Sequence, residues 1–406
     1  MISADIQTNN TFTAAALCAA GAEKVLANEL RKLNLRVLDA AGYGRVKFSA
    51  DLAGLYRALM GLRTADRVLL EAGFFQAQDF DKLFNGARKV HWDKYIPEGM
   101  GLTVVKVRSN RSKLKAETSI QSVVHKAAAE QLCYAYKISR LPEKELCAEI
   151  RVYIEKDQVS LLLDLSGAPL FKRGYRTEGG IAPLRETSAA ALLLLSGWKR
   201  KYPLYDPFCG SGTILIEAAM YAWDMAPGLG RHFAIEKLLI SDKEIEETVR
   251  REFRDRINFN NIIRIAGSDD DSRTVSIAAS NCQRVKDIAL GMDPVRGIRS
   301  SSQGENADKN LPLFKVQTFD KARPFCDEGF IITNPPYGRR LGETSDSERI
   351  YSEMSIFRKN FYGWKLGVIT DHPGFESFFN CKADSCREIS NGAVLTYFYQ
   401  YEQLKK

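Results

Sequence analysis

A glycine-rich turn near the middle of the chain constrains the fold more than any other feature. The turn, Asp-Pro-Phe-Cys-Gly-Ser-Gly-Thr at residues 206–213, follows a short strand ending at Tyr205 and leads directly into a helix-like run at residues 214–223. An acid at a strand end, a glycine turn and a helix start meet at the carboxyl edge of a parallel sheet, where nucleoside cofactors bind. Glycine has no Cβ, so the backbone there can approach a ligand closely. The sequence therefore predicts an α/β domain with a nucleoside site at this edge.

The complete string of eight residues is far more specific than a Gly-x-Gly pair. No Gly-Lys-Ser/Thr follows it, which excludes a phosphate-binding loop. It resembles motif I of the class I S-adenosylmethionine-dependent methyltransferases, and this resemblance implies S-adenosyl-L-methionine as the cofactor. An acid there suits the ammonium of the cofactor, and the helix-start amides suit its carboxylate. The residues of this turn expected to bind the cofactor are Asp206, Phe208, Gly210, Ser211, Gly212 and Thr213.

Three residues outside the turn are also expected at the cofactor. Asp269 follows a short apolar strand at residues 262–265 and would bind the ribose hydroxyls. Relatives usually carry an apolar residue next, where this chain has Asp270. Asp320, shortly after an expected fourth strand at residues 313–316, would bind the adenine amine. Thr187 begins the helix before the turn, where it would either border the cofactor or cap the helix.

A second motif, at the end of an apolar strand, indicates the chemistry. Residues 330–333 run straight into Asn334-Pro335-Pro336-Tyr337, and the two prolines make this exit stiff. The Asn334 side-chain oxygen and the Pro335 carbonyl would accept hydrogen bonds from an exocyclic base amine, which localises its lone pair toward a methyl donor. Tyr337 would stack on the base. We therefore expect Asn334, Pro335, Pro336 and Tyr337 to form the catalytic site.

This motif leaves the target base open. It resembles motif IV of the amino-methyltransferases, which act on adenine N6, cytosine N4 or guanine N2. Evidence for the target must come from the rest of the chain.

Basic side chains cluster at two places ahead of the glycine turn. The chain carries 58 Lys and Arg against 50 Asp and Glu, and its net charge of +8 favours polyanionic partners without identifying one. Either cluster alone would suit a solvated face, but together they favour contacts with nucleic-acid phosphates. The expected RNA-binding residues are Lys106, Arg108, Arg111 and Lys113, with Lys115 nearby, and then Lys172, Arg173 and Arg176.

The N-terminal half has its own pattern of strands and helices. Residues 13–19, 21–33 and 45–48 alternate strand, helix and strand, as in a small α/β module. Strands at residues 149–155 and 158–164 are separated by two residues, which predicts a hairpin. A glycine-rich bridge at residues 173–180 is the expected border between the halves. The polar residues 296–310 are expected to form a mobile surface insertion.

Several segments together resemble the THUMP-containing bacterial rRNA guanine-N2 methyltransferases, which correspond to the N-terminal half of the bifunctional large-subunit enzyme. The resemblance extends from about residue 12 to 400. It implies a ferredoxin-like domain (residues 1–60), a THUMP RNA-binding domain (61–165) and a Rossmann-like class I methyltransferase domain with a mostly parallel seven-stranded sheet (166–406). The segments that carry it lie at residues 105–124, 172–176, 182–187, 226–228 and 334–342.

The same resemblance implies a function and a partner. The expected reaction is methylation of guanine N2 in 23S rRNA or a large-subunit precursor, without the family's second modification at guanine N7, whose domain this sequence lacks. Two alternatives are an adenine-N6 methyltransferase acting on DNA or RNA and a non-catalytic RNA-binding ribosome assembly factor. Intact Asp206, Gly210, Gly212 and Asn334 argue against the inert alternative.

Apolar runs, cysteines and histidines indicate the expected location of the protein and whether it binds a metal. No apolar run approaches the roughly 18 to 20 residues that span a bilayer, and the N-terminus lacks the pattern of a secretory signal, so we expect a cytoplasmic protein without membrane contact. The eight cysteines are scattered without a Cys-x-x-Cys pair, and the four histidines have no ligand spacing. We expect no metal.

Overall fold

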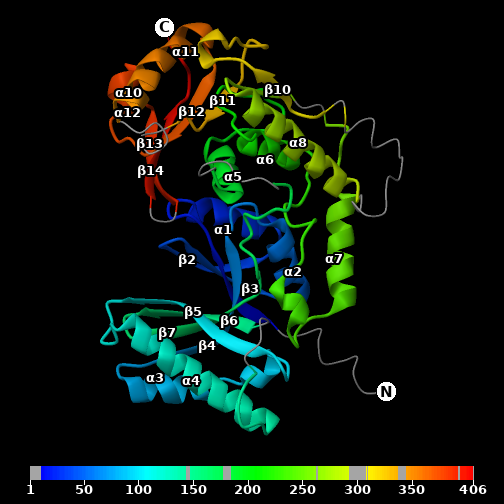
Figure 1. The fold of residues 1–406 in the computed structure, drawn as a ribbon, viewed down its shortest axis with the longest axis vertical. Coiled ribbons are helices and arrows are strands. Elements are labelled where there is room, and N and C mark those ends of the chain that lie inside the picture. Colours follow the sequence, from blue (N-terminus) through cyan, green and yellow to red (C-terminus); the bar gives the residue numbers. More distant parts are fainter. Residues whose placement is uncertain are drawn as a thin grey trace.

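Two seven-stranded sheets, each packed with helices, make up the computed structural model (Figure 1). The structure describes residues 11–142, 147–176, 184–261, 264–291, 308, 310–336, 344–391 and 394–405. The N-terminal half forms the first sheet and the C-terminal half forms the second. Figure 1 shows the two halves one above the other along the longest axis of the molecule.

The first sheet has the strand order β2-β3-β1-β4-β7-β6-β5. Residues along β6 alternate between buried and half-buried, the pattern of a strand with one face on the core. The strand, helix and strand expected in residues 13–48 are confirmed. The elements of this half are β1 (Phe12–Leu17), α1 (Glu23–Lys32), β2 (Arg36–Gly42), β3 (Arg45–Ala50), α2 (Leu52–Gly61), β4 (Arg67–Gln76), α3 (Phe80–Arg88), β5 (Gly101–Asn110), α4 (Glu117–Tyr136), β6 (Cys147–Glu155) and β7 (Gln158–Asp164).

Strand β4 joins the two domains expected in this half. Its first part pairs with β1, with Leu17 opposite Arg67, and from Leu69 to its end it pairs with β7, with Gln76 opposite Gln158. The regions 1–60 and 61–165 therefore share one continuous sheet rather than forming two separate ones. The predicted border falls at the end of α2, just before this shared strand.

The predicted hairpin between β6 and β7 is confirmed. Lys156 and Asp157 have φ values of 51° and 63°, the left-handed geometry of the two-residue turn that matches the twist of its strands. The Asp157 carboxylate also accepts hydrogen bonds of 2.8 Å from the Ser112 hydroxyl and the Lys113 amide. This hairpin therefore fixes the basic loop that follows β5.

The second sheet has the order β10-β9-β8-β11-β12-β14-β13. Five strands are parallel and β14 runs antiparallel to its neighbours, so the expected mostly parallel, seven-stranded class I methyltransferase sheet is confirmed. Its elements are α5 (Glu186–Leu195), β8 (Leu204–Asp206), α6 (Thr213–Ala222), α7 (Lys243–Asp255), β9 (Ile265–Asp269), α8 (Ser272–Ala289), β10 (Leu313–Val316), β11 (Phe330–Thr333), α10 (Thr344–Glu353), α11 (Phe357–Asn360), β12 (Lys365–Thr370), α12 (Phe375–Phe379), β13 (Ser385–Asn391) and β14 (Val394–Tyr401).

The burial of β11 agrees with its central position in the second sheet. All four residues of β11 are buried, as expected of a central strand with helices on both faces. Helices α6 and α8 lie on one side of it and α10 and α12 on the other (Figure 1). Two expectations need correction. Strand β9 begins at Ile265, where the predicted strand was to end. Strand β10 is the third strand of the second sheet in chain order, instead of the fourth.

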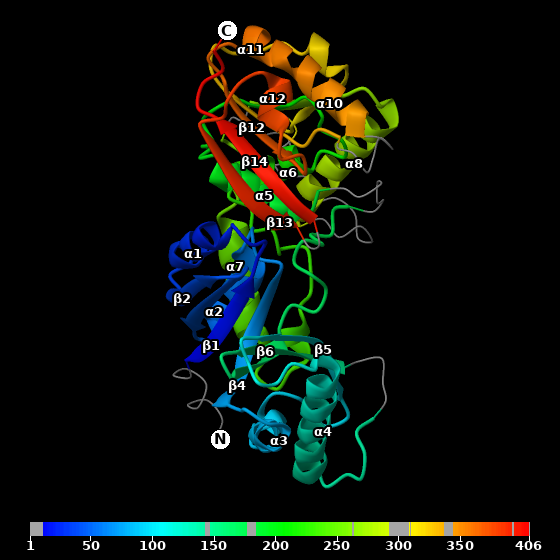
Figure 2. The same ribbon diagram turned by 90° about the vertical axis from the view of Figure 1, so that its left-hand side faces the viewer.

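The two halves lie one above the other (Figure 2), and polar contacts connect them in addition to shared apolar packing. Helix α7 of the second half packs on α2 of the first, where the Arg57 guanidinium makes two hydrogen bonds of 3.1 Å to Glu252. Deeper inside, Arg63 Nη2 donates to the Met225 carbonyl at 2.6 Å. The second half is thus anchored to the first through both surface and buried contacts.

Membrane-spanning helices and metal-binding groups are both absent from the described ranges. Within them, no helix is long and apolar enough to cross a membrane, and no group of His, Cys, Asp and Glu side chains could hold a metal ion. The predicted insertion at residues 296–310 lies largely outside the described residues.

Candidate active site

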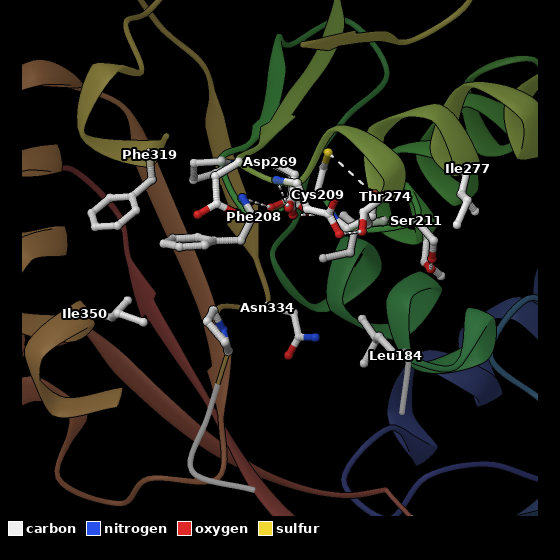
Figure 3. A pocket seen from close by; sticks show the side chains of 18 of the residues that line it. Leu184, Phe208, Cys209, Ser211, Asp269, Thr274, Ile277, Phe319, Asn334 and Ile350 are labelled. Atoms are coloured by element: carbon white, nitrogen blue, oxygen red, sulfur yellow. Dashed lines mark hydrogen bonds between the residues drawn. The ribbon is translucent and has the colours of Figure 1, made fainter. Parts of the chain in front are cut away.

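A cleft of about 600 Å³ lies at the carboxyl ends of β8, β9 and β11 (Figure 3). The glycine turn, the acids after β9 and the end of β11 all contribute to it, so the structure brings the predicted motifs together. Its lining residues are Leu184, Asp206, Pro207, Phe208, Cys209, Gly210, Ser211, Thr213, Ile214, Asp269, Asp270, Asp271, Thr274, Ile277, Phe319, Asn334, Pro336, Arg349, Ile350 and Glu353.

The glycine turn has the backbone geometry that its sequence requires. Gly210 and Gly212 have φ values of 51° and 82°, in the left-handed region where a side chain is strained. A Cβ on Gly212 would also lie 3.0 Å from the Cβ of Ala278. Gly212 is the N-cap of α6, and no side chain caps that end of the helix. The first amides of α6 are therefore available to an anionic ligand group.

Asp206 ends β8 at the floor of the cleft and is buried. Its Oδ1 accepts hydrogen bonds from the Thr333 hydroxyl at 2.6 Å and from the Phe208 amide at 3.1 Å. Burial raises the pKa of this carboxyl to about 7, because the charged form loses solvation there. A cofactor ammonium would supply the counter-charge that the buried carboxylate lacks.

Asp269 is the last residue of β9 and lies directly beside the glycine turn. Its Oδ2 accepts from the Gly210 amide at 2.9 Å and its Oδ1 accepts from the Asp271 amide at 3.2 Å. Burial raises the pKa of this carboxyl as well. The two hydrogen bonds fix the carboxylate at the rim of the cleft, where the sequence predicted the ribose acid.

Asn334, at the end of β11, carries an unsatisfied acceptor. Its Oδ1 is buried and has no hydrogen-bond partner among the described residues. In Figure 3 it lies between Ile350 and Leu184, which line opposite sides of the cleft. Such a buried orphan acceptor is costly unless a ligand donates to it. Tyr337, predicted to stack on the base, lies outside the described residues.

Aromatic and aliphatic side chains complete the cleft. Phe208 and Phe319 have ring centroids 4.8 Å apart, and Ile350 lies on the same side (Figure 3). The sequence had pointed to Asp320 here, but its exposed side chain does not line the cleft and its neighbour Phe319 does. A hydrogen bond from Thr318 lowers the pKa of Asp320 at this outer position. Its predicted contact with the adenine amine therefore has no support in this geometry.

Comparisons with known proteins agree with this arrangement. The profile described as "RMKL-like, methyltransferase domain" matches residues 173–289 and 305–398, and the profile described as "RlmL ferredoxin-like domain" matches residues 13–69. The chain belongs to the RMKL-like methyltransferase family. Its cofactor is therefore S-adenosylmethionine, and its fold is that of the class I enzymes.

Individual relatives of this RMKL-like chain cover it almost completely. "Putative RNA methyltransferase YpsC" of Bacillus subtilis (strain 168) is 35% identical over 96% of both chains. "Ribosomal RNA large subunit methyltransferase K/L" of Syntrophotalea carbinolica is 31% identical over 92% of this chain, but the match spans only 51% of that relative. The crystal structure of SMU.472 complexed with SAH is 33% identical, has a TM-score of 0.83 and matches 98% of this chain and 100% of its own.

Thr187 does not line the cleft of this RMKL-like chain. It is buried in the first turn of α5, and its hydroxyl donates to Asp66 Oδ1 at 2.5 Å. The hydrogen bond therefore connects the two halves of the molecule. No side chain caps α5, so the alternative of a helix cap is wrong, and the proposed border with the cofactor is not supported.

The two basic clusters differ in exposure. All four residues predicted in the first cluster (Lys106, Arg108, Arg111 and Lys113) are exposed, and so is Lys172 of the second. Arg173 is buried and its guanidinium lies 3.2 Å from Glu217, so the prediction that it contacts RNA is wrong. Arg176 is largely buried as well, and it points at α5 and α6 instead of solvent.

Several lining residues were missed from the sequence. Leu184, Ile277, Phe319 and Ile350 are apolar residues in amphipathic or irregular segments, and such residues carry no motif. Only the fold places them at one cleft, because they come from four separate segments.

Proposed function

We propose that this chain transfers a methyl group from S-adenosylmethionine to the exocyclic N2 amine of a guanine in large-subunit ribosomal RNA. The observation that carries the proposal is the buried Oδ1 of Asn334, which has no hydrogen-bond partner among the described residues and lies in the same cleft as the glycine turn. An amine N–H is the donor that this acceptor lacks.

The side chains of the cleft suit this reaction without a strong base. S-adenosylmethionine, when bound, supplies an electrophilic methyl group on its sulfonium. Asn334 Oδ1 and the Pro335 carbonyl accept the two amine N–H groups and so direct the nitrogen lone pair toward that methyl. The methylated nitrogen then sheds its extra proton to solvent. Asp206 is assigned to the cofactor ammonium in this proposal, and its Oδ1 accepts hydrogen bonds from Thr333 and Phe208.

The exposed loop after β5 supports an RNA substrate. Arg111 adopts a left-handed φ of 48°, and the Ser109 hydroxyl donates to the Leu114 carbonyl across the loop. With the bonds to Asp157, these contacts hold a shallow basic recess lined by Ser109, Arg111, Ser112, Lys113, Lys115 and Asp157. A preformed set of cations loses little entropy when it meets phosphates. The expectation that this region is a THUMP domain agrees with such a role.

The names of relatives also point to RNA. Two of the three relatives described above carry RNA or ribosomal RNA methyltransferase in their names, and the match to the K/L protein spans about half of its length. The choice of guanine N2 over adenine N6 as the target rests on the resemblance of the whole chain to the guanine-N2 enzymes. The binding of 23S rRNA or its precursor is part of the same proposal.

Nucleoside mass spectrometry tests the target directly. Ribosomal RNA from a strain lacking the gene, incubated with the protein and S-adenosylmethionine, should gain N2-methylguanosine in its 23S fraction. N6-methyladenosine in its place would establish the adenine alternative, and failure to bind S-adenosylmethionine in calorimetry would favour the inert assembly factor.

Asn334→Ala is the matched test of the catalytic role. It should slow methyl transfer by about 10²- to 10³-fold, the range for losing one positioned transition-state contact. The Kd for S-adenosylmethionine should stay within about threefold, since Asn334 is assigned to the amine and not to the cofactor. Parallel losses of binding and turnover would contradict this assignment.

A further inference from the structure

The charges that line the cleft do not match all parts of the cofactor. The acids suit the sulfonium and the ammonium of S-adenosylmethionine, but they repel its carboxylate. Among the described lining residues the cation is Arg349, which is 68% exposed and pairs with Glu353 at 3.5 Å on α10. The acids are Asp206, Asp269, Asp270, Asp271 and Glu353. The uncapped start of α6 lies on another side of the cleft, and a cation close to it would favour the carboxylate further.

Arg176 lies directly behind that wall of the cleft. Its Nη2 donates to Thr213 Oγ1 at 2.6 Å and to the Leu184 carbonyl at 3.4 Å, and both of these residues line the cleft. Its side chain is only 15% exposed, and its Nη1 lies 3.5 Å from Glu186 Oε1. The guanidinium is thus held one side chain away from the start of α6.

The hydrogen bond to Arg176 determines what Thr213 can do. Because its oxygen accepts from a guanidinium, the Thr213 hydroxyl keeps its own proton for another acceptor. Ser211 Oγ, at 3.5 Å, is at the limit of a hydrogen bond. A carboxylate at the uncapped start of α6 would be the better acceptor, and the positive charge behind the hydroxyl would strengthen that bond.

The neighbouring arginine explains why Arg176 is held so firmly. Thr213 and Glu217 are four residues apart on α6 and so lie on the same face of the helix. Arg176 binds the first and Arg173 binds the second, with the Arg173–Glu217 pair almost completely buried. The segment between the halves is therefore clamped along one face of the helix that begins at the glycine turn.

We propose that Arg176 is a positioning residue that, through Thr213, recognises the carboxylate of the methionyl part of S-adenosylmethionine. This role concerns the binding of the cofactor alone, so its test does not depend on which base is methylated.

Decarboxylated S-adenosylmethionine is the probe that isolates the carboxylate, since it keeps the adenosine, the sulfonium and the ammonium. In calorimetry, Arg176→Gln should raise the Kd for S-adenosylmethionine about 10- to 50-fold, as expected for a lost charge-assisted contact, and should change the Kd for the decarboxylated compound less than about threefold. Arg176→Lys should recover part of the loss. Thr213→Val should reproduce the selectivity of Arg176→Gln, and Thr213→Ser should restore normal binding.

Equal losses for the two ligands would overturn the proposal, because Arg176 would then only keep α6 in place. Unchanged binding of both ligands would overturn it as well. If Arg176→Gln fails to fold, the pair Thr213→Val and Thr213→Ser decides by the same ratio of Kd values, and binding of the decarboxylated compound shows that each tested variant is folded.

Discussion

The two basic clusters look alike in the sequence and behave in opposite ways in the structure. Around Lys106 and Arg111 the cations are exposed on a loop that the β6–β7 hairpin fixes. In the second cluster Arg173 and Arg176 turn inward and pair with acids on α6 and α5, and only Lys172 is exposed. Exposed cations keep their solvation and are available to phosphates, whereas buried cations need a partner within the protein. The first cluster is therefore the proposed contact for RNA, whereas Arg173 and Arg176 of the second hold the segment between the halves against α5 and α6.

The largest effect should come from breaking the buried pair. Arg173→Met removes the cation that pairs with the Glu217 carboxylate, in a position where both side chains are at most 2% exposed. Removing one partner of such a pair typically costs about 3–5 kcal/mol. We expect the first thermal or urea unfolding transition to shift by a corresponding amount.

The double variant Arg173→Met, Glu217→Leu is the control. Since it removes both charges together, it should recover most of the lost stability. A single Arg173→Met variant as stable as the wild type would mean that the second cluster is not a structural unit, and the contrast between the clusters would disappear.

The exposed cluster should affect RNA and leave stability unchanged. Replacing Lys106, Arg108 and Arg111 with Ala should weaken RNA binding about 10- to 100-fold at low salt and reduce the slope of log K against log salt by about 2 to 3, since each lost phosphate contact removes about 0.7 to 0.9. Filter binding at several salt concentrations measures both quantities.

A charge-matched control separates a local contact from the net charge of the protein. Lys243, Arg251 and Arg254 are exposed on α7, away from the basic loop. Their triple Ala variant loses the same three charges, so it should retain the wild-type salt slope. Equal slopes for both triple variants would remove the loop after β5 from the RNA interface.

Features of the fold and site that depend on neighbouring residues could be predicted from the sequence, and those that depend on distant residues could not. The glycine turn and the strand that leads into Asn334 were predicted correctly because their signals are local. These signals are the backbone conformation at Gly210 and Gly212 and the stiffness that two prolines give. The burial of Arg173 could not be predicted, because its partner Glu217 is 44 residues away and only the fold brings them together. The sheet shared through β4 was missed for the same reason, since pairing between distant strands leaves no local pattern.

The buried carboxyl of Asp206 allows a test of cofactor binding through its pH dependence. Burial raises the pKa of Asp206 to about 7, so its carboxyl is increasingly protonated below pH 7 in the free protein. If the carboxylate binds the cofactor ammonium, the Kd for S-adenosylmethionine should rise up to about tenfold per pH unit below 7, or about 1.4 kcal/mol, and level off above it. Calorimetry between about pH 5.5 and 8.5 would measure this change in Kd.

Asp206→Asn should remove this pH dependence and weaken the binding of the cofactor. The variant should also be more stable than the wild type at alkaline pH. A carboxyl with a raised pKa in the folded state contributes stability that is present at low pH and lost as the pH rises through about 7, and Asn does not ionise. A Kd that stays constant across this range in the wild type would exclude Asp206 as the partner of the ammonium.

The smallest effect should come from Lys172, and it tests the contrast between adjacent residues. Lys172 is exposed, whereas Arg173 next to it is buried. Lys172→Ala should therefore leave the free energy of unfolding unchanged within about 0.5 kcal/mol and weaken RNA binding only a few fold, with a slope change of at most about 1. If Lys172→Ala instead destabilised the protein as much as is expected for Arg173→Met, the Lys172 side chain would also be part of the buried contacts, despite its exposure. The second cluster would then contain no RNA contact, and recognition would depend on the loop after β5.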